Sequence, residues 1–288
     1  MSYTSKKIED NVNVSNPTLT KELFVLLGIT VAIIVVIYVA LGLTVDLLVS
    51  WLPDGVEDRI AVLYPVVFED KKEYDEARGY LQQHVEGLAK EAFPDKQTPY
   101  KVHIIEDAKP NAMALNGRNI LVSTTLITEL KSRNELTFVL AHELGHYANR
   151  DHLRVMGRTL AIMVLTATVL GDNSTISRFI ANSLLAIETR YSQAQETKAD
   201  LFALELLFKH YGHVAGASDF FERLSQKDGA GPYAYLLASH PYPLHRVKTL
   251  NNQIQQKNYP TKTLTPTPKE LKIKTTIRGF ATSMPGGR

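Results

Sequence analysis

The chain has 288 residues, 44% of them hydrophobic, so it can bury a core and is not a generally disordered protein. Its formal net charge of +2 gives no electrostatic reason to expect nucleic acid as a partner. Because the sequence contains no cysteine, disulfide scaffolds, thiolate metal sites and cysteine nucleophiles are excluded, and a bound transition metal must be held by His, Asp or Glu.

The first predicted element is a membrane-spanning helix. Residues 1–22 are polar, and residues 23–45 then form a run of 23 residues without a charge. A helix of that length is about 35 Å long, enough to cross a hydrocarbon core of about 30 Å. We therefore expect a transmembrane anchor over residues 23–52 that contacts the lipid bilayer. The run is too long for a signal peptide, and no small-residue cleavage site follows it.

The cations that flank this helix predict its orientation. Lys6, Lys7 and Lys21 precede it, and Arg59 lies close behind it. The positive-inside rule then places the N-terminus in the cytoplasm and the bulk of the chain outside. In a bacterial inner membrane this is the periplasmic side.

Residues 54–123 predict a helix followed by strands. Residues 54–95 have a helical periodicity, which places Tyr80, Leu81, Val85 and Leu88 on one apolar side of the predicted helix. Residues 100–106 and 119–123 alternate or run apolar and are predicted strands, with a turn at Asn116-Gly117 between them.

Two strong helices and an apolar region follow. One helix, capped by Ser132 or Asn134, is expected through ELTFVLAHELGHYANR, and another over about 188–210. The apolar run 159–171 is too short to cross a bilayer. With SRFIANSLLAI behind it, we expect a buried helical hairpin, and a hairpin that dips into the membrane is the alternative.

These elements predict a mainly α fold with a small β-sheet, of the α+β class. One folded domain is expected over residues 53–258, behind the anchor. The Thr-, Pro- and Lys-rich segment 259–288 is typical of an extended, weakly ordered tail.

The strongest chemical signal is HELGH at residues 142–146, which matches HExxH. His142 and His146 are one helical turn apart on the same face, so both imidazoles can reach one ion. Glu143 is rotated by about 100° and can address a water on that ion instead. Two imidazoles, a carboxylate and one open position suit a catalytic zinc ion, with Glu143 as the base.

A third protein ligand is needed, and Glu196 is our assignment. Glu196 and Asp200 lie four residues apart on the next strong helix, so they share a face, and Asp200 would orient a histidine or an arginine. The rival is His152, because HELGHYANRDH fits the metzincin spacing HExxHxxGxxH with Asn149 in place of Gly. That arrangement requires the helix to break at Asn149.

The order of motifs resembles the membrane-associated gluzincin family of HtpX and the type I CAAX prenyl endopeptidases. HELGH, a hydrophobic hairpin, ETKAD, and then Ser239-His240-Pro241 with Arg246 follow in the family's order, over about residues 60–250. Upstream, NAMALNGRNILVSTTLI is similar to the family's strand segment that leads to the zinc helix. The family's proteins carry several spanning helices, whereas this chain has one clear span.

The resemblance implies a gluzincin-like domain with one zinc ion, held by His142, His146 and Glu196, and Glu143 as the base. It also implies that His240 stabilises the tetrahedral oxyanion and that Arg246 pairs with Asp200. By the same resemblance, Asn111 and Ala112 lie on an edge strand where a substrate peptide adds as an extra strand.

The sequence therefore predicts a membrane-anchored zinc endopeptidase of protein or peptide substrates, in the quality control or processing of membrane or envelope proteins. A zinc-bearing peptide-binding adaptor without turnover is the alternative from another class. A metal-assisted hydrolase of a non-peptide bond is a weaker one.

Overall fold

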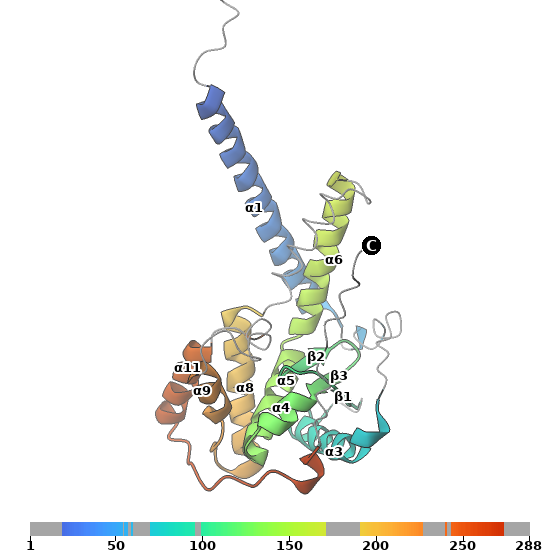
Figure 1. Ribbon diagram of the computed structural model, residues 1–288. Helices are drawn as coiled ribbons and strands as arrows, with labels where there is room; N and C mark the ends of the chain where they lie inside the picture. Colours follow the sequence, from blue (N-terminus) through green and yellow to red (C-terminus); the bar gives the residue numbers. More distant parts are fainter. Residues whose placement is uncertain are drawn as a thin grey trace, which may run out of the picture. The chain divides into compact units, whose positions relative to one another are not determined.

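The computed structural model describes residues 19–53, 55, 56, 59, 70–95, 99–170, 191–226, 240 and 243–273, in two units that divide at residue 50. Figure 1 labels the α-helices and the strands. In chain order the elements are α1 (Leu19–Trp51), η1 (Lys72–Tyr74), α3 (Asp75–Ala92), β1 (Lys101–Ile105), β2 (Ala112–Leu115), β3 (Asn119–Ser123), α4 (Thr124–Glu129), α5 (Arg133–Ala148), α6 (Asp151–Leu170), α8 (Gln193–Tyr211), α9 (Asp219–Gln226), α11 (Pro243–Gln256) and η3 (Lys269–Leu271). The predicted α+β class, mainly helical with a small sheet, is confirmed.

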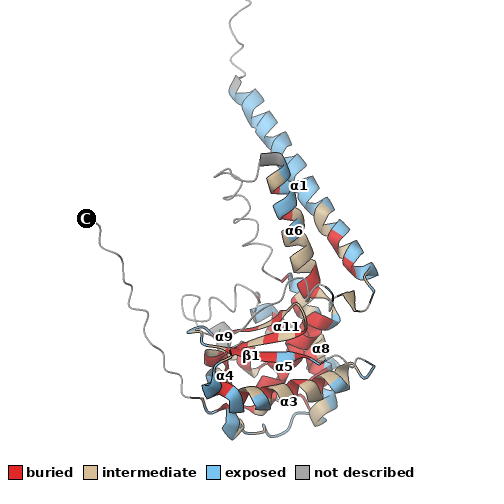
Figure 2. Ribbon diagram, turned by 90° about the vertical axis from the view of Figure 1, so that its right-hand side faces the viewer, coloured by how far each residue is buried: buried red, intermediate tan, exposed pale blue. Residues whose placement is uncertain are grey.

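The first unit consists of α1. Its stretch Thr20–Trp51 is long and apolar enough to cross a membrane, by length and composition. Large apolar side chains are exposed along it, as the pale blue of Figure 2 shows. Such a helix is unfavourable in water and favourable in lipid, which agrees with the predicted anchor.

The second unit contains a three-stranded sheet with the order β1-β3-β2. β1 pairs with β3 in parallel, and β2 pairs with β3 antiparallel, which leaves β2 at an edge. The two predicted strands correspond to β1 and β3. β2 and β3 are joined by a tight turn in which Gly117 and Arg118 are left-handed, one residue later than the predicted Asn116-Gly117 pair.

The core lies between the sheet and the helices α3, α5 and α8. Three of the four residues on the predicted apolar face of α3, Leu81, Val85 and Leu88, are completely buried. They pack in one cluster with the inward residues of the sheet and with leucines of α5 and α8. α5 is buried without interruption from Asn134 to Tyr147 and is coloured red in Figure 2.

α5 and α8 cross at unusually close range. A Cβ atom added at Gly145 would lie 2.9 Å from the Cα of Ala199 and 3.0 Å from its carbonyl oxygen, so the two backbones nearly touch there. Only glycine permits this approach. Because Gly145 precedes His146 and Ala199 follows Glu196 by three residues, the crossing brings the HExxH and ExxxD segments together.

α5 begins and ends with clear signals. Ser132 is its N-cap, since its Oγ accepts a hydrogen bond from the amide of Glu135, which decides between the two predicted caps. The helix ends at Ala148, and Arg150 adopts a left-handed φ of 56° before α6 begins at Asp151. The chain therefore turns sharply between the two helices instead of continuing as one.

Residues 259–273 differ from the expected weakly ordered tail. They are extended, as expected, but they dock on the second unit: the carbonyl of Thr265 accepts from the amide of Arg133, and the amide of Thr265 donates to the side chain of Asn134. Leu271 is buried beside α3. The segment thus holds the start of α5. Residues 274–288 lie outside the described residues.

The apolar region behind α5 is α6, which contains residues 159–170 of the predicted hairpin. Leu160, Met163, Val164 and Leu165 are exposed on this helix, so the expectation of a buried hairpin is not met over this part. The predicted second half of the hairpin, SRFIANSLLAI, lies outside the described residues.

Candidate metal centre

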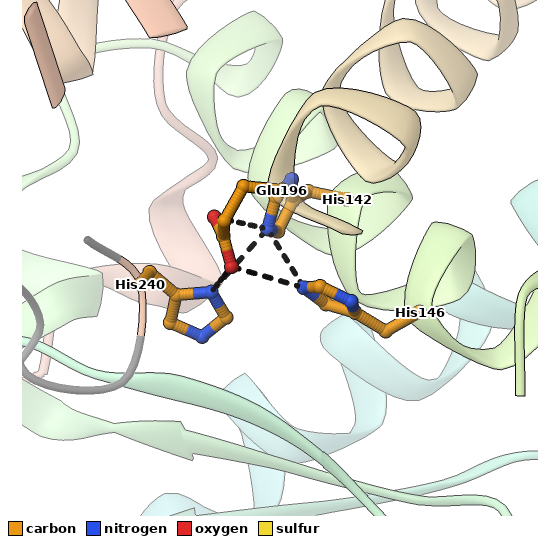
Figure 3. A group of neighbouring side chains, drawn as sticks. All are labelled: His142, His146, Glu196 and His240. Carbon is orange, nitrogen blue, oxygen red and sulfur yellow. Dashed lines mark hydrogen bonds and ion pairs between the residues drawn. The ribbon is translucent and has the colours of Figure 1, made fainter. Parts of the chain in front are cut away.

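Side chains from α5 and α8 converge on one point. Figure 3 shows His142 and His146 from α5 pointing toward Glu196 of α8, with His240 from a separate segment. One ligand atom from each of the four residues lies within 4.8 Å of the others, and all four residues are buried. The two histidine Nε2 atoms are 3.1 Å apart, and a carboxylate oxygen of Glu196 lies 3.6 Å from Nε2 of His146.

Three of these four residues, His142, His146 and Glu196, were predicted from sequence as metal ligands, and the fourth, His240, was not. His240 was assigned a role beside the metal, whereas its Nδ1 lies 3.0 Å from Oε1 of Glu196 and 3.4 Å from Nε2 of His142, within the cluster itself. Its Nε2 is buried without a hydrogen-bond partner and lies 3.8 Å from Oε1 of Glu143. His240 therefore bridges the ligand group and the predicted base.

The charges of the centre fit a divalent cation. Four buried carboxylates surround the histidines, and they belong to Glu143, Asp151, Glu196 and Asp200. Arg246 is the buried guanidinium that pairs with two of them. The remaining negative charge would be costly in a buried site without a further cation. Two or three imidazoles with a carboxylate form a donor set that zinc prefers.

The protonation of the ligands also fits. Burial raises the pKa of Glu196, but the attraction of Arg246 and then of His240 outweighs it, so this pKa lies well below its usual value. Burial, followed by repulsion from Arg246, lowers the pKa of His142. A carboxylate and a neutral imidazole are the forms that bind metals. At His240, burial lowers the pKa, but Glu196 and Glu143 raise it by more.

Asp200 and Arg246 form the predicted pair behind the ligands. Arg246 donates from Nε and Nη2 to the two oxygens of Asp200, at 2.8 and 2.7 Å. Oδ1 of Asp200 also lies 2.9 Å from Nδ1 of His142, and Nη1 of Arg246 lies 2.7 Å from Glu196. Asp200 thus orients the ring of His142 and also the guanidinium of Arg246, which in turn contacts Glu196. Both contacts of Asp200 therefore keep a predicted metal ligand in place.

Glu143 lies next to the cluster and is not one of its four members. Its Oε2 accepts a hydrogen bond of 2.8 Å from the backbone amide of Ala114 on β2. The amide of Ala114 points away from β3 and toward Glu143, so the edge of β2 that is not paired with β3 faces the metal centre. The predicted base and the edge strand are therefore in direct contact.

The strand residues predicted to bind substrate have different environments. Asn111 accepts from the amide of Ser123 and donates its own amide to Ser123 Oγ, so its main chain is already paired with β3. In an antiparallel pair, successive residues direct their main-chain N–H and C=O groups alternately toward and away from the partner strand. The main-chain groups of Ala112 and Ala114 therefore point away from β3, toward the free edge of β2. The side-chain Oδ1 of Asn111 is buried without a hydrogen-bond partner.

The rival third ligand, His152, is not a member of the cluster. The helix does break after Asn149, as the metzincin arrangement requires, but the ring of His152 packs against Tyr147, with centroids 4.7 Å apart. The residue that returns to the centre is Asp151, whose Oδ2 lies 2.9 Å from Nδ1 of His146.

Two contributors to the centre were missed in the sequence. Asp151 follows a left-handed arginine, which no motif encodes. Tyr191 stacks on the ring of His146, with centroids 3.8 Å apart and an interplanar angle of 15°. Asp151 is the first residue of α6, and Tyr191 lies two residues before α8, so their positions at helix starts were the available signal.

Comparison with known families agrees with this geometry. The sequence profile of peptidase family M48 matches residues 75–254, more than half of the chain. The chain belongs to peptidase family M48. The match begins with α3 and ends within α11, so it spans the sheet and both helices that carry the ligands.

Individual relatives of this M48 peptidase are metalloproteases. It is 28% identical over 161 residues to the mitochondrial metalloendopeptidase OMA1 of Schizosaccharomyces pombe, covering 54% of this chain and 47% of that protein. It is 30% identical over 160 residues to metalloprotease YcaL of Escherichia coli, covering 54% and 61%. It is 34% identical over 160 residues to protease HtpX of Legionella pneumophila, covering 54% and 53%.

The M48 peptidase therefore spans about half the length of the relatives that it matches. The resemblance to the HtpX family that the sequence suggested is confirmed. Zinc is the cofactor that the family and the buried His/Glu cluster indicate, with one ion per chain. The apolar helix and the relatives together indicate a membrane protein.

Proposed function

We propose that this M48 member is a membrane-anchored zinc endopeptidase that hydrolyses peptide bonds of protein substrates, in the processing or quality control of membrane or envelope proteins. The observation that carries the proposal is the buried convergence of His142, His146 and Glu196, with Glu143 beside them and in contact with an edge strand. When bound, zinc supplies a Lewis acid that polarises the peptide carbonyl and makes water a better nucleophile at neutral pH.

The side chains around the metal divide the remaining work. His142, His146 and Glu196 would hold the ion, and Asp200 with Arg246 keeps two of these ligands oriented. Glu143 takes the proton of the attacking water on its carboxylate and later transfers it to the leaving amine. The hydrogen bond from Ala114 fixes one oxygen of Glu143, so the other oxygen is free to perform this transfer.

The edge of the sheet provides a binding mode for an extended peptide. The outward main-chain groups of Ala112 and the outward carbonyl of Ala114 on β2 can pair with a substrate strand, while the amide of Ala114 stays on Glu143. The buried Oδ1 of Asn111 can accept from a substrate amide. Because these contacts use main-chain atoms of the substrate, they suit protein substrates of varied sequence.

His240 is proposed to stabilise the oxyanion. Its Nδ1 is engaged with Glu196, which leaves Nε2 as a buried donor toward Glu143 and the reacting carbonyl. His240→Ala should then lower kcat by about 100-fold or more with zinc affinity unchanged. If His240 is instead a fourth ligand, the same variant will lose zinc affinity, as a chelator competition would show.

The test of the proposed activity is Glu143→Gln. The purified variant should retain stoichiometric zinc but lose cleavage of a casein-like substrate, because the amide cannot take up a proton. Glu205→Gln, at an exposed residue of α8, is the matched control and should cleave like the wild type. Retained turnover in Glu143→Gln would contradict the assignment of the base.

A zinc-bearing adaptor that binds peptides without cleaving them is the alternative. Glu143 is buried and held by a backbone hydrogen bond beside the ligands, which a binding module would not need. A peptidase assay with and without chelator separates the two: cleavage that zinc restores after chelation supports the enzyme, and peptide binding without cleavage supports the adaptor.

We propose that the N-terminus is cytoplasmic and the peptidase domain lies on the other side of the membrane, the periplasmic side in a bacterium. Lys6 and Lys7 before α1 and Lys21 in its first turn support this orientation. Since the chain has no cysteine, single cysteines can report it. A cysteine at Glu205 should react with an impermeant maleimide from outside the cell membrane, and one at Ser5 should not; the reverse labelling would reject this orientation.

A second contact with lipid is proposed for α6. Leu160, Met163, Val164 and Leu165 are exposed, whereas Ile162 and Thr166 on the same turns are buried, so this part of the helix presents an apolar face outward. No charged residue occurs from Thr159 to Leu170. Such a face is unfavourable in water and favourable in a bilayer.

A further inference from the structure

We propose that Asp151 is a positioning residue of the metal centre, which fixes the ring of His146 and ties it to the helix that carries Glu196. The proposal rests on the zinc site described above, with His146 as a ligand. It concerns a residue that lies outside both the HExxH and the ExxxD segments.

The turn after α5 is built so that Asp151 returns to the metal centre. Arg150 has a φ of 56°, a conformation that a residue with a side chain adopts rarely. This reverses the chain within two residues of the end of α5. As a result, the carboxylate of Asp151, which is 2% exposed, lies 2.9 Å from Nδ1 of His146, five residues upstream.

The second oxygen of Asp151 reaches the other ligand helix. Its Oδ1 accepts from Nε2 of Gln195, at 2.9 Å, and Gln195 is the neighbour of Glu196. Gln195 cannot reverse its amide freely, because its Oε1 accepts from the amide of Ser192 in the capping box of α8. Asp151 is therefore held between His146 of α5 and the N-terminus of α8.

This chain of hydrogen bonds selects the tautomer of His146. An ionised carboxylate only accepts, so Nδ1 of His146 carries the hydrogen. Nε2 then keeps its lone pair for the metal, which is the form a ligand requires. The stacked ring of Tyr191 fixes the plane of the imidazole as well. His142 has the same arrangement with Asp200, so each ligand histidine has its own carboxylate.

Asp151→Asn tests this logic with almost no change in shape. The capping box keeps the Nε2 of Gln195 pointing at residue 151, so the asparagine must present its oxygen to Gln195 and its NH₂ group to His146. Nδ1 of His146 then accepts, and the hydrogen moves to Nε2, where it blocks the metal. Zinc affinity, measured by competition with a chelator, should fall by about 10- to 100-fold.

Asp151→Asn combined with Gln195→Glu should restore binding. A glutamate at 195 still accepts from Ser192, and its other oxygen accepts from the asparagine NH₂, which turns the asparagine oxygen back toward His146. The net charge of this double variant equals that of the wild type. Both variants should melt, without metal, close to the wild type, and the zinc-induced rise in melting temperature should be small in the single variant and large in the double one.

Wild-type zinc affinity in Asp151→Asn would overturn the proposal. So would a weakened variant that Gln195→Glu fails to restore, since the loss would then be general damage to the site. His146→Ala separates this inference from the proposed site. If His146→Ala binds zinc like the wild type, the ligand assignment is wrong; if it loses zinc while Asp151→Asn does not, only the role of Asp151 is wrong.

Discussion

His84 is a buried histidine of α3 that the metal centre does not use. Its Nε2 lies 2.7 Å from Oγ1 of Thr137 on α5, and its ring stacks with that of Tyr80. Burial, followed by repulsion from Arg133 and His210, lowers the pKa of His84 to about 3. The same imidazole in an unfolded chain titrates near its ordinary value of 6.5.

This difference predicts an acid-sensitive contribution to stability. Between pH 6.5 and about 3 the unfolded chain binds a proton at His84 that the folded chain does not, so stability falls as the pH falls, by up to about 1.4 kcal/mol per pH unit. His84→Gln should flatten the decline, as urea unfolding at several pH values would show. The exposed His245→Gln is the control and should keep the wild-type slope. An unchanged slope in His84→Gln would refute the assignment.

At the residue scale, sequence alone could predict the side chains whose geometry is local. His142, Glu143 and His146 follow from the spacing of one helix, and Glu196 with Asp200 from the spacing of another. Asp151 could not be predicted, because its place depends on a left-handed Arg150 between two helices. In the rival metzincin arrangement His152 would return to the metal centre, whereas the side chain that returns is Asp151.

At the scale of elements, the crossing of α5 and α8 determines where the ligands meet. Gly145 faces Ala199 with no room for a Cβ atom, so any side chain at 145 must push the helices apart. The displacement would move Glu196 away from both histidines. Zinc binding should therefore be more sensitive to residue 145 than folding is.

Gly145→Ala tests this crossing. Overpacking costs about 1–3 kcal/mol, and the better helix propensity of alanine returns about 1 kcal/mol, so the free energy of unfolding should fall by up to about 2 kcal/mol. Zinc affinity should also fall. Gly79→Ala on α3 is the matched control, since nothing lies within 4 Å of its added Cβ, and it should be neutral or stabilising. Equal effects of the two substitutions on zinc affinity would contradict a close crossing.

Elements with a hydrophobic period could be predicted, and those held by main-chain hydrogen bonds could not. The strands β1 and β3 and the helices α3, α5 and α8 follow from their patterns. Residues 259–273 have the composition of a linker, yet Thr265 pairs with Arg133 and Asn134 at the start of α5. Main-chain groups are the same in every residue, so composition carries no signal of this docking.

At the scale of the whole molecule, α1 indicates a membrane protein, and α6 is proposed as a second contact with lipid. α1 was predicted from its uninterrupted apolar run, a signal that depends on length and composition and on no tertiary contact. α6 could not be resolved from sequence, because a run of that length is equally typical of a buried helix. Its exposed apolar side chains favour the membrane alternative.

Lipid contact of α6 can be measured with a probe at Val164, which is 66% exposed, the most among the apolar side chains of this helix that the structure describes. A cysteine placed there in the cysteine-free chain carries an environment-sensitive fluorophore, and the protein is reconstituted in vesicles that contain nitroxide-labelled lipids. Because the apolar face of α6 gains free energy only in contact with acyl chains, lipid nitroxides should quench the probe strongly. The same fluorophore at Glu205, on the exposed surface of α8, should be quenched little. Equally weak quenching at both positions would show that α6 faces water or protein, and α1 would then be the anchor that holds the enzyme near membrane substrates.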